Sequence, residues 1–245
     1  MTEPQVVSQA AQPSKSSVWE DFIDIFYAPA DVFRRRENGS WFVPMLVTTV
    51  LITLISFLTY GALEGAYQPI IDKAIDAVMQ TPGASPDVAD RVRRFVPWQI
   101  KLGPLLFIPL LILGVAILMW LVGKFFGSRQ TFRSAMVVAG YAQVARVVGS
   151  LVVGIEGLLM DSSKITSLNA IALGPTRFVA RGSTSPIAYA MLFRLDIFTI
   201  WATVLIGIGI YVTGKVSKGT ATAMAIVIWL LGSLPTIRQF MLGQM

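Results

Sequence analysis

The sequence predicts an all-α, polytopic membrane protein with five transmembrane helices and an N-terminal amphipathic helix at the membrane interface. Of its 245 residues, 54% are hydrophobic and 14% are charged, and the mean hydropathy is +0.66. Soluble domains carry about 25% charged residues, so this chain is too apolar for that class. Its long uncharged stretches match the roughly 20 residues that a helix needs to cross a bilayer. Composition and segment length together therefore predict one helical membrane domain, with the lipid bilayer as its first partner.

The composition also excludes several classes of function. The chain contains no cysteine and no histidine, which removes disulfides, thiolate nucleophiles, imidazole bases and the usual zinc or haem ligands. We therefore expect no enzymatic activity, no metal and no cofactor. The net charge is +6, but the basic residues are scattered between apolar segments and form no continuous stripe. This distribution favours attraction to anionic lipid headgroups over binding of nucleic acid.

The N-terminal region divides into two parts. Residues 1–17 are rich in Ser, Gln, Pro and Ala and are predicted to form a disordered tail. Residues 18–40 are predicted to form an interfacial amphipathic segment. Its apolar side chains recur at helical spacing, with acidic side chains on the opposite face: Trp19, Phe22, Ile23 and Phe26 against Glu20, Asp21 and Asp24. The basic run Arg34, Arg35 and Arg36 directly precedes the first span, and we interpret it as a topology anchor.

The predicted transmembrane domain covers residues 41–242. Its five spans are expected at about 41–63, 102–125, 134–160, 188–214 and 219–240. The second is the clearest, because Lys101 and Lys124 bracket an uncharged run from Leu102 to Gly123. The polar segment between the first two spans carries two amphipathic patterns, which predict two helices along the membrane surface.

An odd number of spans places the two termini on opposite sides of the membrane. Lys and Arg are equally numerous on both sides, so their count does not decide the orientation. On the N-terminal side, however, most of them lie in tight turns or next to the first span, where the positive-inside rule is strongest. We therefore predict a cytoplasmic N-terminus and an outside C-terminus.

Two predicted spans carry charges at membrane depth. Arg146 lies near the middle of the third span and Glu156 near its end, while Arg194 and Asp196 lie in the fourth. A guanidinium at the bilayer centre costs roughly 3 kcal/mol on insertion scales, so it should face protein, water or a carboxylate. Helical rise places Arg146 and Asp196 roughly 9 Å apart in depth. We predict that these two residues pair, with Glu156 and Arg194 as secondary charges at the outer interface.

Two short motifs carry a resemblance to a known family. An aromatic residue, Tyr, any residue and Pro occur around Tyr27 and Pro29, and the third span contains the pair Gly140 and Tyr141. In these features the chain resembles the Yip family of small multi-pass membrane proteins, especially its bacterial members. The resemblance implies a non-enzymatic protein that, in eukaryotic relatives, helps to organise transport vesicles by contacting partners and shaping bilayers.

The sequence is therefore compatible with two functions. The first is a membrane-organising or partner-binding scaffold of the bacterial cytoplasmic membrane, with a protein partner at the cytoplasmic N-terminal segment. The second is a small transporter or channel that uses Arg146 and Asp196. The pair also has a purely structural interpretation, in which it fixes the packing of the third and fourth spans. The oligomeric state is not set by the sequence.

Overall fold

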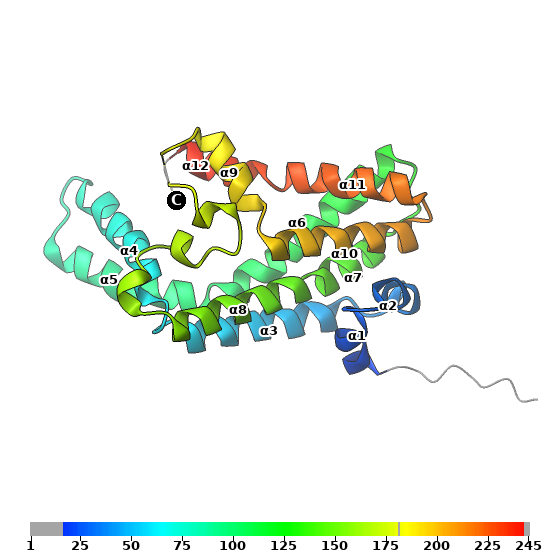
Figure 1. Ribbon diagram of the computed structural model, residues 1–245, viewed down its shortest axis with the longest axis horizontal. Coiled ribbons are helices and arrows are strands. Elements are labelled where there is room, and N and C mark those ends of the chain that lie inside the picture. Colours follow the sequence, from blue (N-terminus) through cyan, green and yellow to red (C-terminus); the bar gives the residue numbers. More distant parts are fainter. Residues whose placement is uncertain (1–16, 181, 243–245) are drawn as a thin grey trace, which may run out of the picture.

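The computed structural model describes residues 17–180 and 182–242, so the predicted tail lies outside the described residues apart from Ser17. All regular secondary structure in the described part is helical, and it contains no strand (Figure 1). Five helical segments are long and apolar enough to cross a membrane. They are α3 (Phe42–Thr59), α6 (Pro104–Phe125), α7 with α8 (Phe132–Leu159), α10 (Ile197–Gly214) and α11 with α12 (Lys218–Met241). The predicted fold class of an all-α membrane protein with five spans is confirmed.

The third span forms the core of the bundle. It consists of α7 (Phe132–Ala142) and α8 (Val144–Leu159), which meet at Gln143. Of its most apolar 18-residue window 61% is buried, against 28% to 44% for the other spans. Helices α3 and α10 pack along both halves, and α6 packs along α7. The third and fourth spans are therefore neighbours, as a buried arginine in the third requires.

Two short helices precede the first span and lie against the side of the bundle. Helix α1 (Val18–Asp24) begins with a capping box, in which the Ser17 side chain accepts from the Glu20 amide and the Glu20 side chain accepts from the Ser17 amide. Helix α2 (Pro29–Arg36) begins with proline at its first position, where the missing N–H is not needed. Helix α2 packs on α10 and α7. We refer to residues 18–36 as the α1–α2 hairpin.

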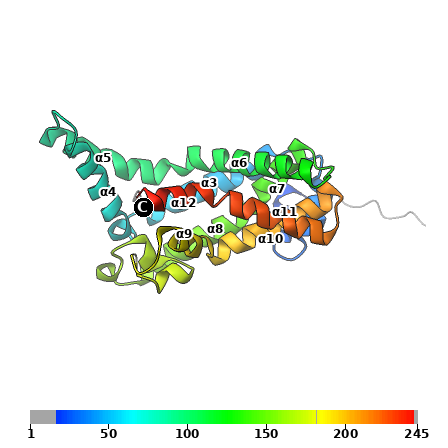
Figure 2. The same cartoon turned by 90° about the horizontal axis from the view of Figure 1, so that it is seen from above.

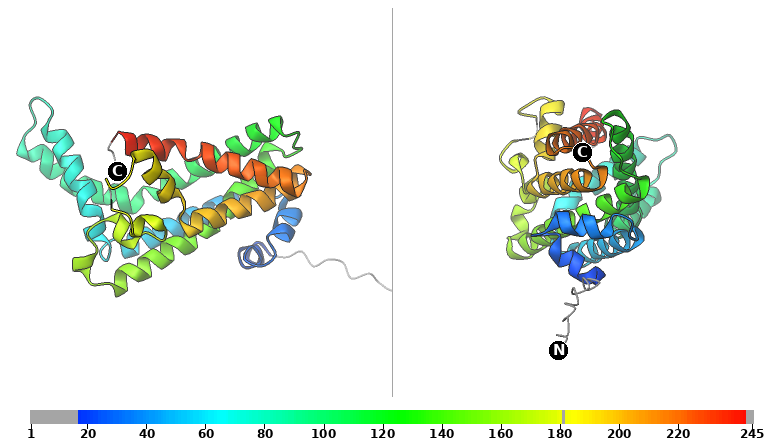
Figure 3. Two further views of the ribbon diagram at one scale, coloured as in Figure 1. Left: turned by 45° about the horizontal axis from the view of Figure 1, so that its top comes forward. Right: turned by 90° about the vertical axis from the view of Figure 1, so that its right-hand side faces the viewer.

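The opposite end of the bundle carries the longer connections. Helices α4 (Glu64–Met79) and α5 (Pro86–Leu102) form a hairpin that projects away from the bundle (Figures 2 and 3). At its base the Lys101 ammonium lies 4.3 Å from the ring centroid of Tyr60 and 5.1 Å from that of Trp98. The loop before the fourth span contains three short 3-10 helices, η1 (Ser162–Lys164), η2 (Leu168–Ile171) and η3 (Pro175–Arg177).

The region of the predicted fourth span is divided in two. Helix α9 (Pro186–Arg194) packs against α12 (Leu234–Met241), and α10 starts after a break at Leu195 and Asp196. Asp196 caps α10, because its Oδ1 accepts from the amides of Phe198 at 2.9 Å and Thr199 at 3.2 Å. Such a cap satisfies amides that have no partner within the helix. Helix α10 then leads through a short turn into α11 (Lys218–Leu231).

Candidate functional site: a buried ion cluster and an intramembrane cavity

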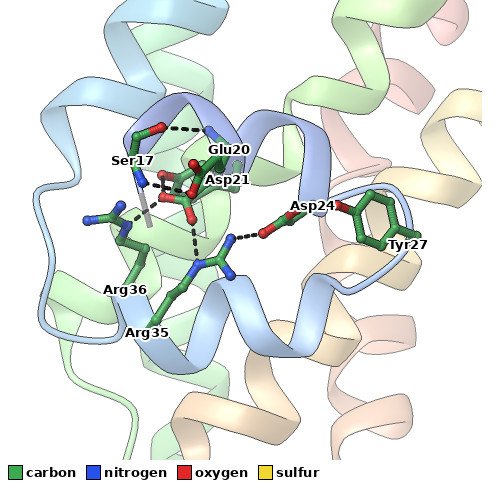
Figure 4. Close-up of polar contacts among 8 residues, drawn as sticks. Ser17, Glu20, Asp21, Asp24, Tyr27, Arg35 and Arg36 are labelled. Carbon is green, nitrogen blue, oxygen red and sulfur yellow. Dashed lines mark hydrogen bonds and ion pairs between the residues drawn. The ribbon is translucent and has the colours of Figure 1, made fainter. Parts of the chain in front are cut away.

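A buried carboxylate fastens the α1–α2 hairpin to the third span. Asp21 is 0% exposed. It accepts from Arg35 Nε at 2.6 Å and from Arg36 Nε (Figure 4). Tyr141 Oη of α7 also donates to it, at 3.0 Å. We call these four residues the Asp21 cluster. A carboxylate can remain charged in such a position because two cations and a hydroxyl compensate it.

A second carboxylate extends the cluster to the turn of the hairpin. Asp24 accepts from Tyr27 Oη and from Arg35 Nη2 (Figure 4). The hydrogen bond from Tyr27, followed by that from Arg35, holds the pKa of Asp24 below its ordinary value of 3.8. The same bond raises the pKa of the Tyr27 phenol. The carboxylate form of Asp24 and the protonated form of Tyr27 are thus the forms that stabilise the folded turn.

The lowered pKa predicts how the hairpin responds to acid. Because the folded state binds this proton more weakly than the unfolded state, the contribution of Asp24 is present above its unfolded value and is lost as the pH falls through its folded value. We expect a nitroxide attached near the turn to become more mobile as the pH falls below about 4, the ordinary pKa of an aspartate. In Asp24→Asn this pH-dependent change should shrink, and an equal change in the variant would contradict the assignment.

The four family-motif positions lie in two places. Tyr27 is 71% exposed at the hairpin turn, and Pro29 starts α2. Gly140 lies where α7 crosses α3, because a Cβ added there would be 3.3 Å from the side chain of Pro44. Tyr141, the next residue, belongs to the Asp21 cluster. The Gly-Tyr pair therefore combines a close helix contact with a hydrogen bond to the hairpin.

Sequence reasoning did not single out Asp21, Arg35 and Arg36 as a cluster. The helical pattern placed Asp21 on a polar face, whereas the structure buries it and leaves Trp19 and Ile23 exposed at 69% and 63%. Asp21 lies four residues before Ile25 and so shares a helix face with this apolar residue; both are 0% exposed in the structure. A tyrosine hydroxyl inside a span also called for a polar partner.

Arg146 and Asp196 line one cavity. It has a volume of about 310 Å³ and lies between α3, α8 and the start of α10. Five hydroxyl-bearing side chains share its wall: Ser56, Thr59, Tyr67, Ser150 and Thr199. Within residues 17–180 and 182–242 the two charged groups form no ion pair within 4.0 Å, and Arg146 Nε has no hydrogen-bond partner. Direct pairing of Arg146 with Asp196 stays a prediction. What the structure shows is that both residues line the same polar cavity.

The two secondary charges lie elsewhere. Glu156 pairs with Arg177 of η3, which ties the long loop to α8. Arg194 Nε donates to Ser233 Oγ at 3.2 Å, and its guanidinium lies 5.9 Å from the ring centroid of Trp229. These contacts connect α9 to the junction of α11 and α12. The position of both charges relative to the outer membrane interface stays a prediction.

Comparison with known proteins identifies the family. The model of the Yip1 domain matches residues 23–237, a range that starts in α1, ends in α12 and includes the first four spans and most of the fifth. No curated protein and no solved structure matches the chain. The match takes in Tyr27, Pro29, Gly140 and Tyr141, the residues that carried the resemblance. The chain belongs to the Yip1-domain family and is a multi-pass membrane protein.

Proposed function

We propose that this chain is a non-enzymatic, membrane-organising protein whose α1–α2 hairpin inserts into one leaflet and presents a docking surface there. The observation that carries the proposal is the way in which the hairpin is held. Its carboxylate Asp21 faces the spans and is 0% exposed, whereas Trp19 and Ile23 face outward. An element fixed in this orientation offers apolar side chains to lipid without having to unfold.

The contacts of the hairpin lie along the spans and not only at their ends. The ring of Phe26 is 5.2 Å from that of Trp201, and Trp201 lies about 20 Å along α10 from Gly214 at 1.5 Å per residue. The ring of Phe22 is 5.4 Å from that of Tyr141. After α2, Glu37 pairs with Lys215 at 2.8 Å, next to the end of α10. The hairpin therefore extends from the helix ends toward the middle of the bundle.

The exposed side chains of the hairpin fit the boundary between headgroups and acyl chains. Trp19 and Ile23 are apolar, whereas Asp31 and Arg34 are charged and form an exposed ion pair. Amphipathic helices with these two faces lie about 5–10 Å into the boundary. Insertion into a single leaflet expands that leaflet relative to the other and so favours a bent bilayer. The charged side remains available to a protein partner.

We place the hairpin on the cytoplasmic side of a bacterial cytoplasmic membrane. The same end of the bundle carries the short connections around Lys124, Arg129, Arg133, Lys215 and Lys218. Clusters of basic residues in short loops favour the cytoplasmic side. The C-terminal end of the chain would then lie outside.

Insertion of the hairpin can be tested site by site, because the natural chain has no cysteine. We expect a nitroxide on Ile23→Cys in liposomes to collide more often with oxygen than with a water-soluble nickel complex. The matched control is Asp31→Cys on the charged side, for which the order should be reversed. In tubes pulled from giant vesicles, the unmodified protein should be enriched relative to Ile23→Asp. A label at residue 23 as accessible to nickel as the one at residue 31 would rule out insertion.

A second function is favoured by the polar cavity of Arg146 and Asp196. Two opposite charges and five hydroxyl-bearing side chains around a space of about 310 Å³ are features of a solute pathway. If the chain transports a solute, proteoliposomes should show flux that Arg146→Gln abolishes. Absence of flux from the unmodified protein across a panel of ions and small solutes would exclude this function.

A further inference from the structure

We propose that a groove between α10, α11 and the turn of the α1–α2 hairpin binds one anionic glycerophospholipid. An acyl chain would fill the groove, and the phosphate would lie at Lys218. The groove has a volume of about 600 Å³. Small residues open it, namely Ala28 of the turn, Gly207 of α10, and Ala221 and Ala225 of α11. This inference goes beyond the role proposed for the hairpin, because it assigns a specific lipid site to the transmembrane domain.

The length of the groove matches the acyl region of one leaflet. On α11 its wall extends from Lys218 to Ile226, which corresponds to about 12 Å of helical rise. Half of a bilayer core about 30 Å thick is about 15 Å. Lys218 begins α11 and is exposed, so the charged end of the groove lies where a headgroup would be.

The walls of the groove favour an acyl chain over a helix from a second copy of the protein. The turn from Tyr27 to Ala30 lines one side of the groove, while α10 and α11 line the others. A helix about 10 Å wide would have to pack against all three walls at once, whereas a single hydrocarbon chain can follow the small residues between them.

The charges around the mouth favour an anionic lipid. Lys218 forms no ion pair within the part of the chain that the structure describes, and its ammonium lies 5.9 Å from the ring centroid of Tyr211. Lys215, by contrast, is paired with Glu37. None of the residues that line the groove is acidic. A cation without an ion-pair partner at the mouth of an apolar groove is complementary to a phospholipid, whose phosphate would lie at the cation and whose acyl chain would fill the groove.

Native mass spectrometry can test the headgroup preference directly. The protein, in mild detergent, would be given equal amounts of phosphatidylglycerol and phosphatidylcholine with identical acyl chains. We expect one retained lipid, with phosphatidylglycerol preferred about fivefold, the effect of one lysine near an anionic headgroup. Lys218→Gln should retain a lipid but lose the preference. The matched control is Lys124→Gln, since Lys124 also lies over an aromatic ring, 4.9 Å from the centroid of Trp120, but does not line the groove.

Filling the groove tests the acyl part of the site. Thr222 lies on the wall at an exposed position of α11, so Thr222→Phe should fold and should reduce retention of both lipids. Ile226→Trp fills the groove one helical turn further along α11, and it provides the same test if Thr222→Phe does not fold. Val50→Phe, at a position of α3 that is 47% exposed and outside the groove, is the control and should retain the lipid. Three results would overturn the proposal: no lipid on the unmodified protein, unchanged retention in both filled variants, or a protein dimer that Thr222→Phe disrupts.

Discussion

Asp21→Ala is expected to detach the α1–α2 hairpin from the spans at a cost of about 3 kcal/mol. The substitution leaves Arg35, Arg36 and the Tyr141 hydroxyl without their shared acceptor. Loss of one partner of a buried ion pair costs about 3–5 kcal/mol. The lower end applies here, because the two arginine side chains keep 29% and 24% of their exposure and can recover part of their hydration. A change of this size shifts the docking equilibrium more than a hundredfold.

Trypsin measures this equilibrium, since it cleaves after Arg35 and Arg36 only when the hairpin is released. We expect the rate of cleavage at these two bonds to rise about a hundredfold in Asp21→Ala, while circular dichroism shows unchanged melting of the spans. The matched control is Asp31→Ala. Asp31 and Arg34 form an ion pair whose side chains are 60% and 65% exposed, and such pairs contribute less than about 1 kcal/mol. Equal cleavage rates in the two variants would show that the Asp21 cluster does not hold the hairpin.

The spans were predictable from the sequence because the bilayer imposes a simple length requirement. Lys101 and Lys124 bound a run that covers all but the last two residues of α6, which the structure places at Pro104–Phe125. The burial of Asp21 was not predictable by the same reasoning. In water an apolar stripe shows which face of a helix is packed, but next to lipid an apolar face can equally point outward. The proposed insertion of the hairpin accounts in this way for the exposure of Trp19 and Ile23, and the packed face of α1 is the one that carries the carboxylate of Asp21.

The cavity, too, could be predicted from the sequence only in part. The cost of a guanidinium in lipid led us to expect Arg146 to face protein, water or a carboxylate, and in the structure it lines a cavity together with Asp196. The sequence did not indicate that Asp196 uses an oxygen to cap α10, because capping depends on where the helix breaks. It also gave no information on the space between the two groups, which depends on how α3, α8 and α10 diverge.

Gly209→Ala is expected to destabilise the transmembrane domain, although alanine is the better helix former. At this residue α10 crosses α7, and a Cβ would lie 2.3 Å and 2.7 Å from the two methyl carbons of Val138. Valine in a helix is confined largely to one rotamer, so these methyl groups cannot turn away and the helices must separate. Overpacking of this kind costs about 1–3 kcal/mol, which outweighs the roughly 1 kcal/mol that alanine gains over glycine in a helix. The melting temperature of the purified protein should therefore fall.

The neighbouring Gly207→Ala provides the matched control, because its Cβ would lie 3.4 Å from that of Ala225, an ordinary contact. Its melting temperature should be unchanged or slightly higher, since the helix gains propensity without a clash. Adding Val138→Ala to Gly209→Ala should recover most of the lost stability, because the space that the new methyl group needs is then present. In a double-mutant cycle the two substitutions should therefore show a favourable coupling. Strictly additive effects, or a Gly209→Ala variant that melts above Gly207→Ala, would mean that α7 and α10 do not meet at this point.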